Sequence, residues 1–158
     1  MAGNTTTGRA ALASEVWRHV FDFFMHTRPR RDAVLRDLGL TPNDARALSG
    51  LDVARGRSMR QLAEGWDCDA SNVTWMVGRL EKRGLARRQT DPEDRRARSV
   101  VLTARGARVR RQLEEGMHAP PAELSHLEMD ELEHLRGVFE RLAAEAAKTA
   151  EATSRGGR

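Results

Sequence analysis

The sequence is poor in the features that mark secreted and membrane proteins. Its 158 residues include one cysteine, Cys68, which excludes an intrachain disulfide framework and suits a reducing compartment. No uninterrupted apolar run approaches the length that spans a bilayer, and residues 1–10 lack the apolar core of a secretory signal. These absences predict cytoplasmic localisation and no membrane partner.

Motifs for catalysis and for metal binding are missing as well. The sequence has no glycine-rich phosphate loop, no nucleophile elbow and no HExxH motif. His118, His126 and His134 recur every eight residues, but two prolines separate the first two, and the one-turn spacing of a chelate is absent. We interpret them as surface or interface histidines. The sequence therefore predicts a protein that is not an enzyme and that holds neither a metal ion nor a cofactor.

The chain is short for two domains. At 158 residues it is long enough for one domain with a core. We expect a single domain over residues 9–150, where apolar residues recur with helical spacing. Small and polar residues fill segments 1–8 and 151–158, and we expect both to be disordered tails.

Charged residues are plentiful but unevenly placed. The formal net charge is +4, yet residues 79–111 hold twelve basic and four acidic side chains. Residues 114–145 reverse the balance, with nine acidic and two basic side chains. One basic pole and one acidic pole are typical of a protein that presents one face to a polyanion. A run of charged residues is more often a solvated surface than a binding site. The motifs inside the basic segment therefore decide between a solvated surface and a surface that binds a polyanion.

Two short helical patterns lead into the basic segment, and a tight break separates them. Apolar residues at 59–63 have one-turn spacing, residues 65–69 interrupt the pattern, and a second apolar stripe ends at Gly84. The second stripe consists of Val73, Met76, Val77 and Leu80. The pattern predicts a helix-turn-helix whose second helix runs from Ala70 to Arg83 and enters the major groove of DNA.

A β hairpin is predicted directly after the second helix. Residues 85–89 can extend as a strand, residues 90–94 carry turn residues, and residues 98–103 are rich in β-branched side chains. Met59 is a candidate for a brief third strand. The result is a two- to three-stranded wing with an arginine-rich tip, which suits insertion into a narrow minor groove.

The motifs of this segment resemble a known family. The run DPEDRRARSVVLTARG, preceded by VTWMVGRLEKRGLARR, is similar to the MarR family of bacterial winged-helix transcriptional regulators. The resemblance rests on the DP-x-DRR run and on the V-x-LT-x-x-G strand exit that follows it. It implies a homodimeric repressor or activator whose DNA affinity changes with a small phenolic or lipophilic ligand, or with oxidation. Trp75 departs from the pattern, because an arginine commonly follows the threonine there.

Further helices are predicted on both sides of the DNA-binding part, which spans residues 41–106. Thr41, followed by proline, is a strong helix start, and this helix would carry Leu48, Leu51 and Val53 towards the core. A short helix is expected before it, at residues 32–38.

The terminal helices are predicted to join two copies of the chain. Residues 9–27 carry apolar side chains on two sides, and residues 124–149 trace a long apolar stripe flanked by acids. We expect dimerisation helices at 9–27 and 107–150, which would form an isologous twofold interface. The expected fold is thus mainly α, a winged helix-turn-helix with a small β wing and terminal dimerisation helices.

The candidate DNA contacts come from the outer face of the second helix and from the wing. The inner stripe leaves five side chains of that helix facing outwards, namely Ser71, Asn72, Thr74, Trp75 and Arg79. Trp75 could touch a thymine methyl or a sugar edge, or pack against the wing. In the wing, family correspondence places Arg96 in the minor groove, with Arg95 and Arg98 as phosphate or structural partners.

Two features leave a regulatory role open. An effector pocket could be lined by Trp17, Phe21, Phe24 and Met25. Plain core or interface packing of these side chains is the alternative. Cys68 precedes the second helix, whose positive end would favour the thiolate and hence oxidation, although a lone cysteine is more often a small packing residue.

The sequence thus predicts a transcriptional regulator, most simply a ligand-responsive repressor that acts as a homodimer on a pseudo-palindromic operator in double-stranded DNA. The alternative is a winged-helix protein that binds DNA without sequence preference, as an architectural protein does, or that docks another protein. Steep salt dependence without sequence preference would favour the alternative.

Overall fold

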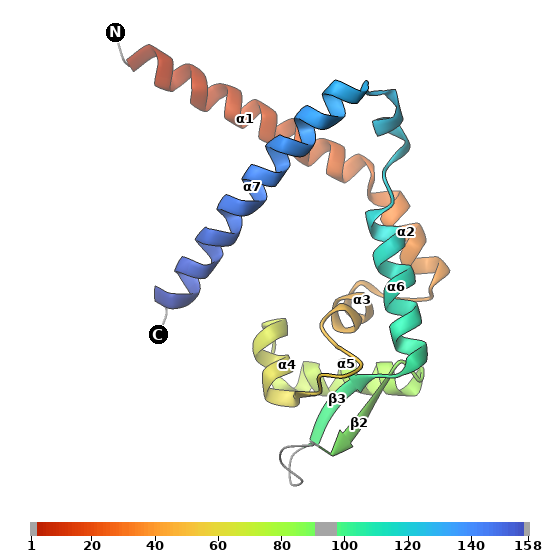
Figure 1. The fold of residues 1–158 in the computed structure, drawn as a ribbon. Helices are drawn as coiled ribbons and strands as arrows, with labels where there is room; N and C mark the ends of the chain where they lie inside the picture. Colours follow the sequence, from red (N-terminus) through yellow and green to blue (C-terminus); the bar gives the residue numbers. More distant parts are fainter. Residues whose placement is uncertain (1–2, 91–97, 157–158) are drawn as a thin grey trace. The chain divides into compact units, whose positions relative to one another are not determined.

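The computed structural model describes the backbone of residues 3–90 and 98–156 (Figure 1). The chain divides into two compact units, Met1–Ala119 and Pro120–Arg158. Among the described residues, no helix is both long enough and apolar enough to cross a membrane.

Two consecutive helices open the first unit. Helix α1 spans Gly3–His26 and α2 spans Arg28–Asp37. Helix α1 begins six residues earlier than expected, so its backbone covers most of the segment expected to be a tail. Helix α2 begins four residues earlier than expected, because Pro29 lies in its first turn, where the missing N–H costs no hydrogen bond.

Helix α3 spans Pro42–Ser49 and starts at the cap that the sequence predicted. The Thr41 hydroxyl accepts a hydrogen bond from the Asp44 amide at 3.2 Å, and the Thr41 amide donates to the Asp44 carboxylate at 3.0 Å. The prediction for Val53 was wrong, because its side chain is 49% exposed. It lies beyond the end of α3, in a turn where the Asp52 carboxylate accepts hydrogen bonds from the amides of Ala54 and Arg55.

The predicted helix-turn-helix is confirmed as α4, Met59–Trp66, and α5, Ala70–Lys82. Ser58 caps α4, and Asp69 caps α5 by accepting from the Asn72 amide. Between the helices Asp67 adopts a left-handed conformation with φ of 48°, which ends α4 and turns the chain sharply. Figure 1 shows α4 and α5 side by side next to the β hairpin.

The predicted wing is confirmed as a three-stranded antiparallel sheet. Its strands are β1 (Arg57–Ser58), β2 (Ala86–Thr90) and β3 (Arg98–Leu102), in the order β1-β3-β2. Met59 was the candidate for a brief third strand. That strand is β1, which ends one residue earlier, at Ser58, and pairs with β3 so that Arg57 lies opposite Val100. The sheet thus ties the start of the helix-turn-helix to the hairpin that follows it.

Helix α6, Ala104–His118, begins two residues after the end of β3, and Thr103 lies between the two elements. Thr103 caps the helix by accepting from the Gly106 amide at 3.0 Å, and its hydroxyl also donates to the Gly84 carbonyl at 2.7 Å. One threonine therefore joins the end of β3, the start of α6 and the turn after α5.

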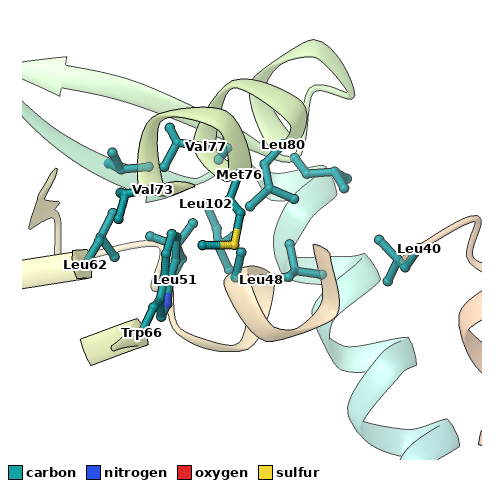
Figure 2. Close-up of a cluster of buried hydrophobic side chains, with 14 of the residues drawn as sticks. Leu40, Leu48, Leu51, Leu62, Trp66, Val73, Met76, Val77, Leu80 and Leu102 are labelled. Atoms are coloured by element: carbon teal, nitrogen blue, oxygen red, sulfur yellow. The ribbon is translucent and has the colours of Figure 1, made fainter. Parts of the chain in front are cut away.

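The hydrophobic core lies under α5 (Figure 2). The inner stripe predicted for α5 is confirmed, because all four of its side chains are buried. In Figure 2 they face Leu48 and Leu51. Most of the remaining core side chains come from α4, the sheet, the turn before β2 and α6, including Leu62, Trp66, Leu85, Val100, Leu102 and Leu113. The second helix of the motif is therefore held on its inner side by all surrounding elements.

The second unit holds a short 3-10 helix, Ala122–His126, and the long helix α7, Met129–Gly156. A single helix over 124–149 was expected. Leu127 is extended and separates the two, so Leu124 belongs to the 3-10 helix. Helix α7 also continues beyond residue 150. Its Leu135, Phe139 and Leu142 side chains are exposed.

Candidate nucleic-acid interface

The outer face of α5 is the candidate surface for DNA. Ser71, Asn72, Thr74 and Trp75 are exposed there, as the helical spacing predicted. Because α5 is held from below by the core, its outer side chains have a rigid base. Whether they contact DNA stays a prediction.

Asp69 orients the polar side chains at the start of α5. Its carboxylate accepts hydrogen bonds from the Ser71 hydroxyl at 2.5 Å and from the Asn72 side-chain amide at 3.0 Å. The bonds from Ser71 and from the Asn72 amides lower the pKa of Asp69, so the carboxylate is charged at neutral pH. Sequence reasoning passed over Asp69, although an aspartate before a helix start signals an N-cap.

Thr74 has a different local arrangement. Its hydroxyl donates to the Ala70 carbonyl, one turn earlier, at 2.8 Å. A hydroxyl bonded back to its own helix is less available as a donor to a base edge.

Arg79 differs most from its predicted role as an outward-facing residue. It is only half-exposed, and its guanidinium donates two hydrogen bonds to Asp44 of α3, from Nε at 2.9 Å and from Nη2 at 2.8 Å. Asp44 is 1% exposed, and a buried carboxylate needs such a partner. The sequence did not predict this ion pair, because the two residues are 35 positions apart in the chain.

A second arginine completes the cluster around Asp44. Arg83 approaches the carboxylate at 3.6 Å and donates to the carbonyls of Leu38 and Gly39 at 3.0 and 2.6 Å. Burial alone would raise the pKa of Asp44, but hydrogen bonds from Arg79 and Thr41 outweigh burial and lower this pKa to about 2. The charged cluster fastens α5 to α3.

Trp75 lies beside this cluster on the outer face. Its ring is stacked by Arg79, with the guanidinium carbon 4.9 Å from the ring centroid, and its side chain is 52% exposed. This contact lies within α5; the tip of the wing lies outside the described residues, so packing of Trp75 against the wing stays an open alternative.

The described part of the wing carries exposed basic side chains. Arg98 begins β3, and Arg87 and Arg88 lie on β2. Arg88 is paired with Glu81 of α5 at 2.7 Å, which joins the wing to the second helix. Arg95 and Arg96 lie outside the described residues, so their predicted roles stay predictions.

The candidate effector residues lie on α1. Trp17, Phe21, Phe24 and Met25 are exposed. Arg31 of α2 stacks on Phe24, with its guanidinium carbon 3.8 Å from the ring centroid. An enclosed pocket around these side chains would need a further covering surface.

Cys68 and the three spaced histidines were also considered in the sequence. Cys68 is half-buried and packs against the hydrophobic core, which is the packing role the sequence left open. His118, His126 and His134 are exposed. Within the described residues, no three histidine, cysteine, aspartate or glutamate side chains gather as metal ligands.

Comparison with known proteins gives matches in sequence. A model of the MarR family matches residues 38–97. The putative transcriptional regulatory protein for the hcr operon of Thauera aromatica is 30% identical over 112 residues, which are 70% of this chain and 68% of that protein. The HTH-type transcriptional regulator YcgE of Bacillus subtilis is 37% identical over 73 residues, 46% of this chain. That match spans about half of YcgE, 47% of its length.

Solved structures share the fold. The YusO protein of Bacillus subtilis superposes with a TM-score of 0.72 at 26% identity, covering 85% of this chain and 96% of that chain. The S. aureus MepR structure in complex with DNA has a TM-score of 0.65 at 19% identity, covering 82% of this chain and 98% of that chain. The helical architecture with a small antiparallel sheet is therefore a winged-helix fold.

Proposed function

This chain belongs to the MarR family of DNA-binding transcriptional regulators, and from that premise we propose that it acts as a homodimer on a pseudo-palindromic operator. The observation that carries the proposal is the outer face of α5, which is exposed and rigidly supported. One α5 helix would enter the major groove of each half-site. Operator symmetry would then mirror the twofold symmetry of the protein.

The terminal helices support the proposal of a homodimer. On α1, Leu12 and Val16 are exposed, and on α7 so are Phe139 and Leu142. Exposed apolar side chains at one-turn spacing on long helices call for a covering surface. A second copy of the chain offers the same stripes and can cover them in an isologous interface.

The proposed DNA contacts divide by chemistry. Ser71 and Asn72 would bond to base edges or phosphates through polar atoms at the start of α5. Arg98 in β3 is exposed and suits a phosphate contact. Arg95 and Arg96 complete the proposed wing contact, with Arg96 in the minor groove. Arg79 is the least suited of the predicted set, because Asp44 occupies two of its nitrogens.

A small phenolic or lipophilic effector is the proposed regulatory input. Support comes from Trp17, Phe21, Phe24 and Met25, which are exposed on one helix, and from S. aureus MepR, which has been solved bound to ethidium bromide. An effector that binds one spacing of the two α5 helices more tightly would shift the homodimer towards that spacing. DNA affinity would change only if that spacing differs from the spacing that two major grooves require.

Selection of random duplexes at fixed salt concentration tests the central proposal. We expect an inverted repeat, bound by two chains as measured by light scattering and at least roughly a thousandfold more tightly than scrambled DNA. Binding that falls steeply with salt but does not prefer any sequence would instead indicate the architectural alternative. Enrichment of no duplex, with no DNA binding, would point to a protein-docking role.

Arg96→Ala tests the wing. We expect at least roughly a tenfold loss of operator affinity in an anisotropy titration, with the homodimer intact. Arg136→Ala on α7 is the matched control, because this exposed arginine lies in the acidic part of the chain, paired with Glu140. Equal affinities of both variants would remove Arg96 from the proposed contact.

Phe21→Ala tests the effector surface. A panel of phenolic and lipophilic compounds would be screened for release of the operator duplex, and an active compound would then be titrated against the variant. We expect the variant to bind operator normally and to need a higher concentration of the compound for release. Release at the same concentration would place the effector elsewhere.

A further inference from the structure

Trp75 places a large apolar surface among polar neighbours. It lies on the exposed face of α5, one turn after Ser71 and one turn before Arg79, and it is 52% exposed. All other large apolar side chains in α5 are buried in the core. About half of the indole therefore lies open on a face whose other exposed side chains are polar.

The indole of Trp75 is held in place by a chain of contacts. Arg79 stacks on the ring, with its guanidinium carbon 4.9 Å from the ring centroid. Its guanidinium is fixed in turn by two hydrogen bonds, at 2.9 and 2.8 Å, to the buried carboxylate of Asp44. A ring that is fixed before binding loses little conformational freedom when it contacts a ligand.

The same contacts also determine which chemical groups at this position are available to contact DNA. Asp44 occupies two donors of Arg79 and offsets part of its charge, so a phosphate gains less from Arg79 than from an unpaired arginine. What faces outwards is the aromatic ring of Trp75, whose one polar group is a single N–H donor. In the major groove, bases present donors, acceptors and one apolar group, which is the 5-methyl group of thymine.

We propose that Trp75 is a specificity-determining residue that reads a thymine methyl group in each half-site, and that Asp44 and Arg79 are positioning residues for its ring. The proposal rests on the proposed function, because it requires α5 to lie in the major groove. It goes beyond that function by assigning one side chain to one chemical group of the operator.

The size of the effect follows from the area that one methyl group buries. Removing one buried methyl group is expected to weaken binding roughly fourfold per half-site, and roughly sixteenfold when both half-sites are changed. Loss of a hydrogen-bonded base contact would produce a larger and less uniform effect.

Deoxyuridine scanning of the selected operator tests the proposal, since deoxyuridine pairs as thymine does but lacks the methyl group. Each thymine is replaced in turn, at symmetric positions, and affinity is measured by anisotropy at fixed salt. With the natural chain we expect one thymine per half-site to show the sixteenfold loss. Thymines outside the half-sites serve as the control and should show no loss.

Two variants connect the effect to the proposed residues. With Trp75→Ala, the natural operator should bind more weakly, and the sensitive thymine should no longer be distinguished from deoxyuridine. Arg79→Lys keeps a cation for Asp44 but removes the planar fork that holds the ring, so the deoxyuridine penalty should fall to less than about a quarter of its value. The variant should stay folded with a lower melting temperature, and the salt dependence of its binding should stay close to that of the natural chain.

The outcomes separate this proposal from the proposed function. A selected inverted repeat in which no thymine is sensitive, or which contains no thymine, overturns the methyl contact and leaves the regulator intact. Equal deoxyuridine penalties in the natural chain and in Trp75→Ala assign the methyl contact to another residue and also overturn it. An unchanged penalty in Arg79→Lys overturns the positioning role of Asp44 and Arg79. Failure to select any operator removes the proposed function and this proposal together.

Discussion

Leu80 of α5 and Leu142 of α7 lie on similar apolar stripes but in opposite surroundings. Leu80 is 0% exposed, whereas Leu142 is 58% exposed in the single chain. In the winged helix-turn-helix, the sheet and the neighbouring helices cover the stripe of α5. Leu12 and Val16 on the stripe of α1, and Phe139 and Leu142 on the stripe of α7, are exposed. Helical spacing therefore identifies an apolar face but not the surface that covers it.

The largest predicted effect belongs to the covered stripe. Leu80→Ala should lower the free energy of unfolding by about 2–5 kcal/mol, because it removes a fully buried side chain and leaves a cavity. Urea unfolding followed by circular dichroism measures the change. The self-association of the folded chain, measured by ultracentrifugation, should stay as it is.

Leu142→Ala is the matched substitution in the other region. It should weaken self-association and raise the dissociation constant of the homodimer, because Leu142 lies on the stripe that a second copy is proposed to cover. If ultracentrifugation shows equal self-association of the variant and the natural chain, the contact between copies does not use this part of α7.

The second prediction contrasts two ion pairs that have the same N–O distance of 2.8 Å, Arg79–Asp44 and Lys148–Glu145. The pKa of Asp44 is lowered from 3.8 to about 2 in the folded chain. Its charged form therefore stabilises the fold by about 2 kcal/mol above pH 4, and this contribution is lost as pH falls from 4 to 2. Arg79→Met should lower the free energy of unfolding at pH 7, and its difference from the natural chain should shrink below pH 4.

Lys148→Met in α7 is the control for this pH dependence. Both members of its pair are exposed, and solvent screens the attraction between them. Urea unfolding from pH 7 to pH 3 should give the same curve for this variant as for the natural chain. A constant difference between Arg79→Met and the natural chain at all pH values would show that Asp44 keeps its low pKa without Arg79.

Local signals in the sequence placed most of the winged helix-turn-helix correctly. The caps at Thr41, Ser58 and Thr103 act on amides three residues away, so their chemistry is readable from neighbouring residues. The strands of the wing were likewise readable from β-branched residues and a turn. The four inward side chains of α5 followed from spacing alone, because one face of a helix recurs every three or four residues.

Other features were not predicted, because no pattern of neighbouring residues indicates them. Arg79 was expected to face DNA, but it pairs with Asp44, 35 residues earlier in the chain, and no local pattern links the two. Val53 is apolar and follows a core helix, yet the Asp52 turn leaves it exposed. The early start of α1 at Gly3 was missed because small polar residues carry no apolar period. The DNA and effector contacts stay predictions, since they depend on partners.

The third prediction concerns a position in the covered region where two backbones meet. A Cβ added at Gly106 of α6 would lie 1.9 Å from the Leu85 carbonyl oxygen. Backbone cannot yield as a flexible side chain does, so Gly106→Ala should lower the free energy of unfolding by about 1–3 kcal/mol. Urea unfolding would measure the loss. An unchanged value would mean that the corner between β3 and α6 relaxes freely.

The smallest predicted effect is the same substitution in α7. A Cβ at Gly137 would have as its nearest neighbour the end of the Arg141 side chain, at 3.7 Å, which is ordinary contact. Glycine inside a helix is unfavourable relative to alanine, so Gly137→Ala should raise the free energy of unfolding by up to about 1 kcal/mol. The two alanines should thus act with opposite signs in the two regions. Weaker self-association of Gly137→Ala would reveal that a second copy approaches α7 closely at this glycine, where the added methyl group would collide with it.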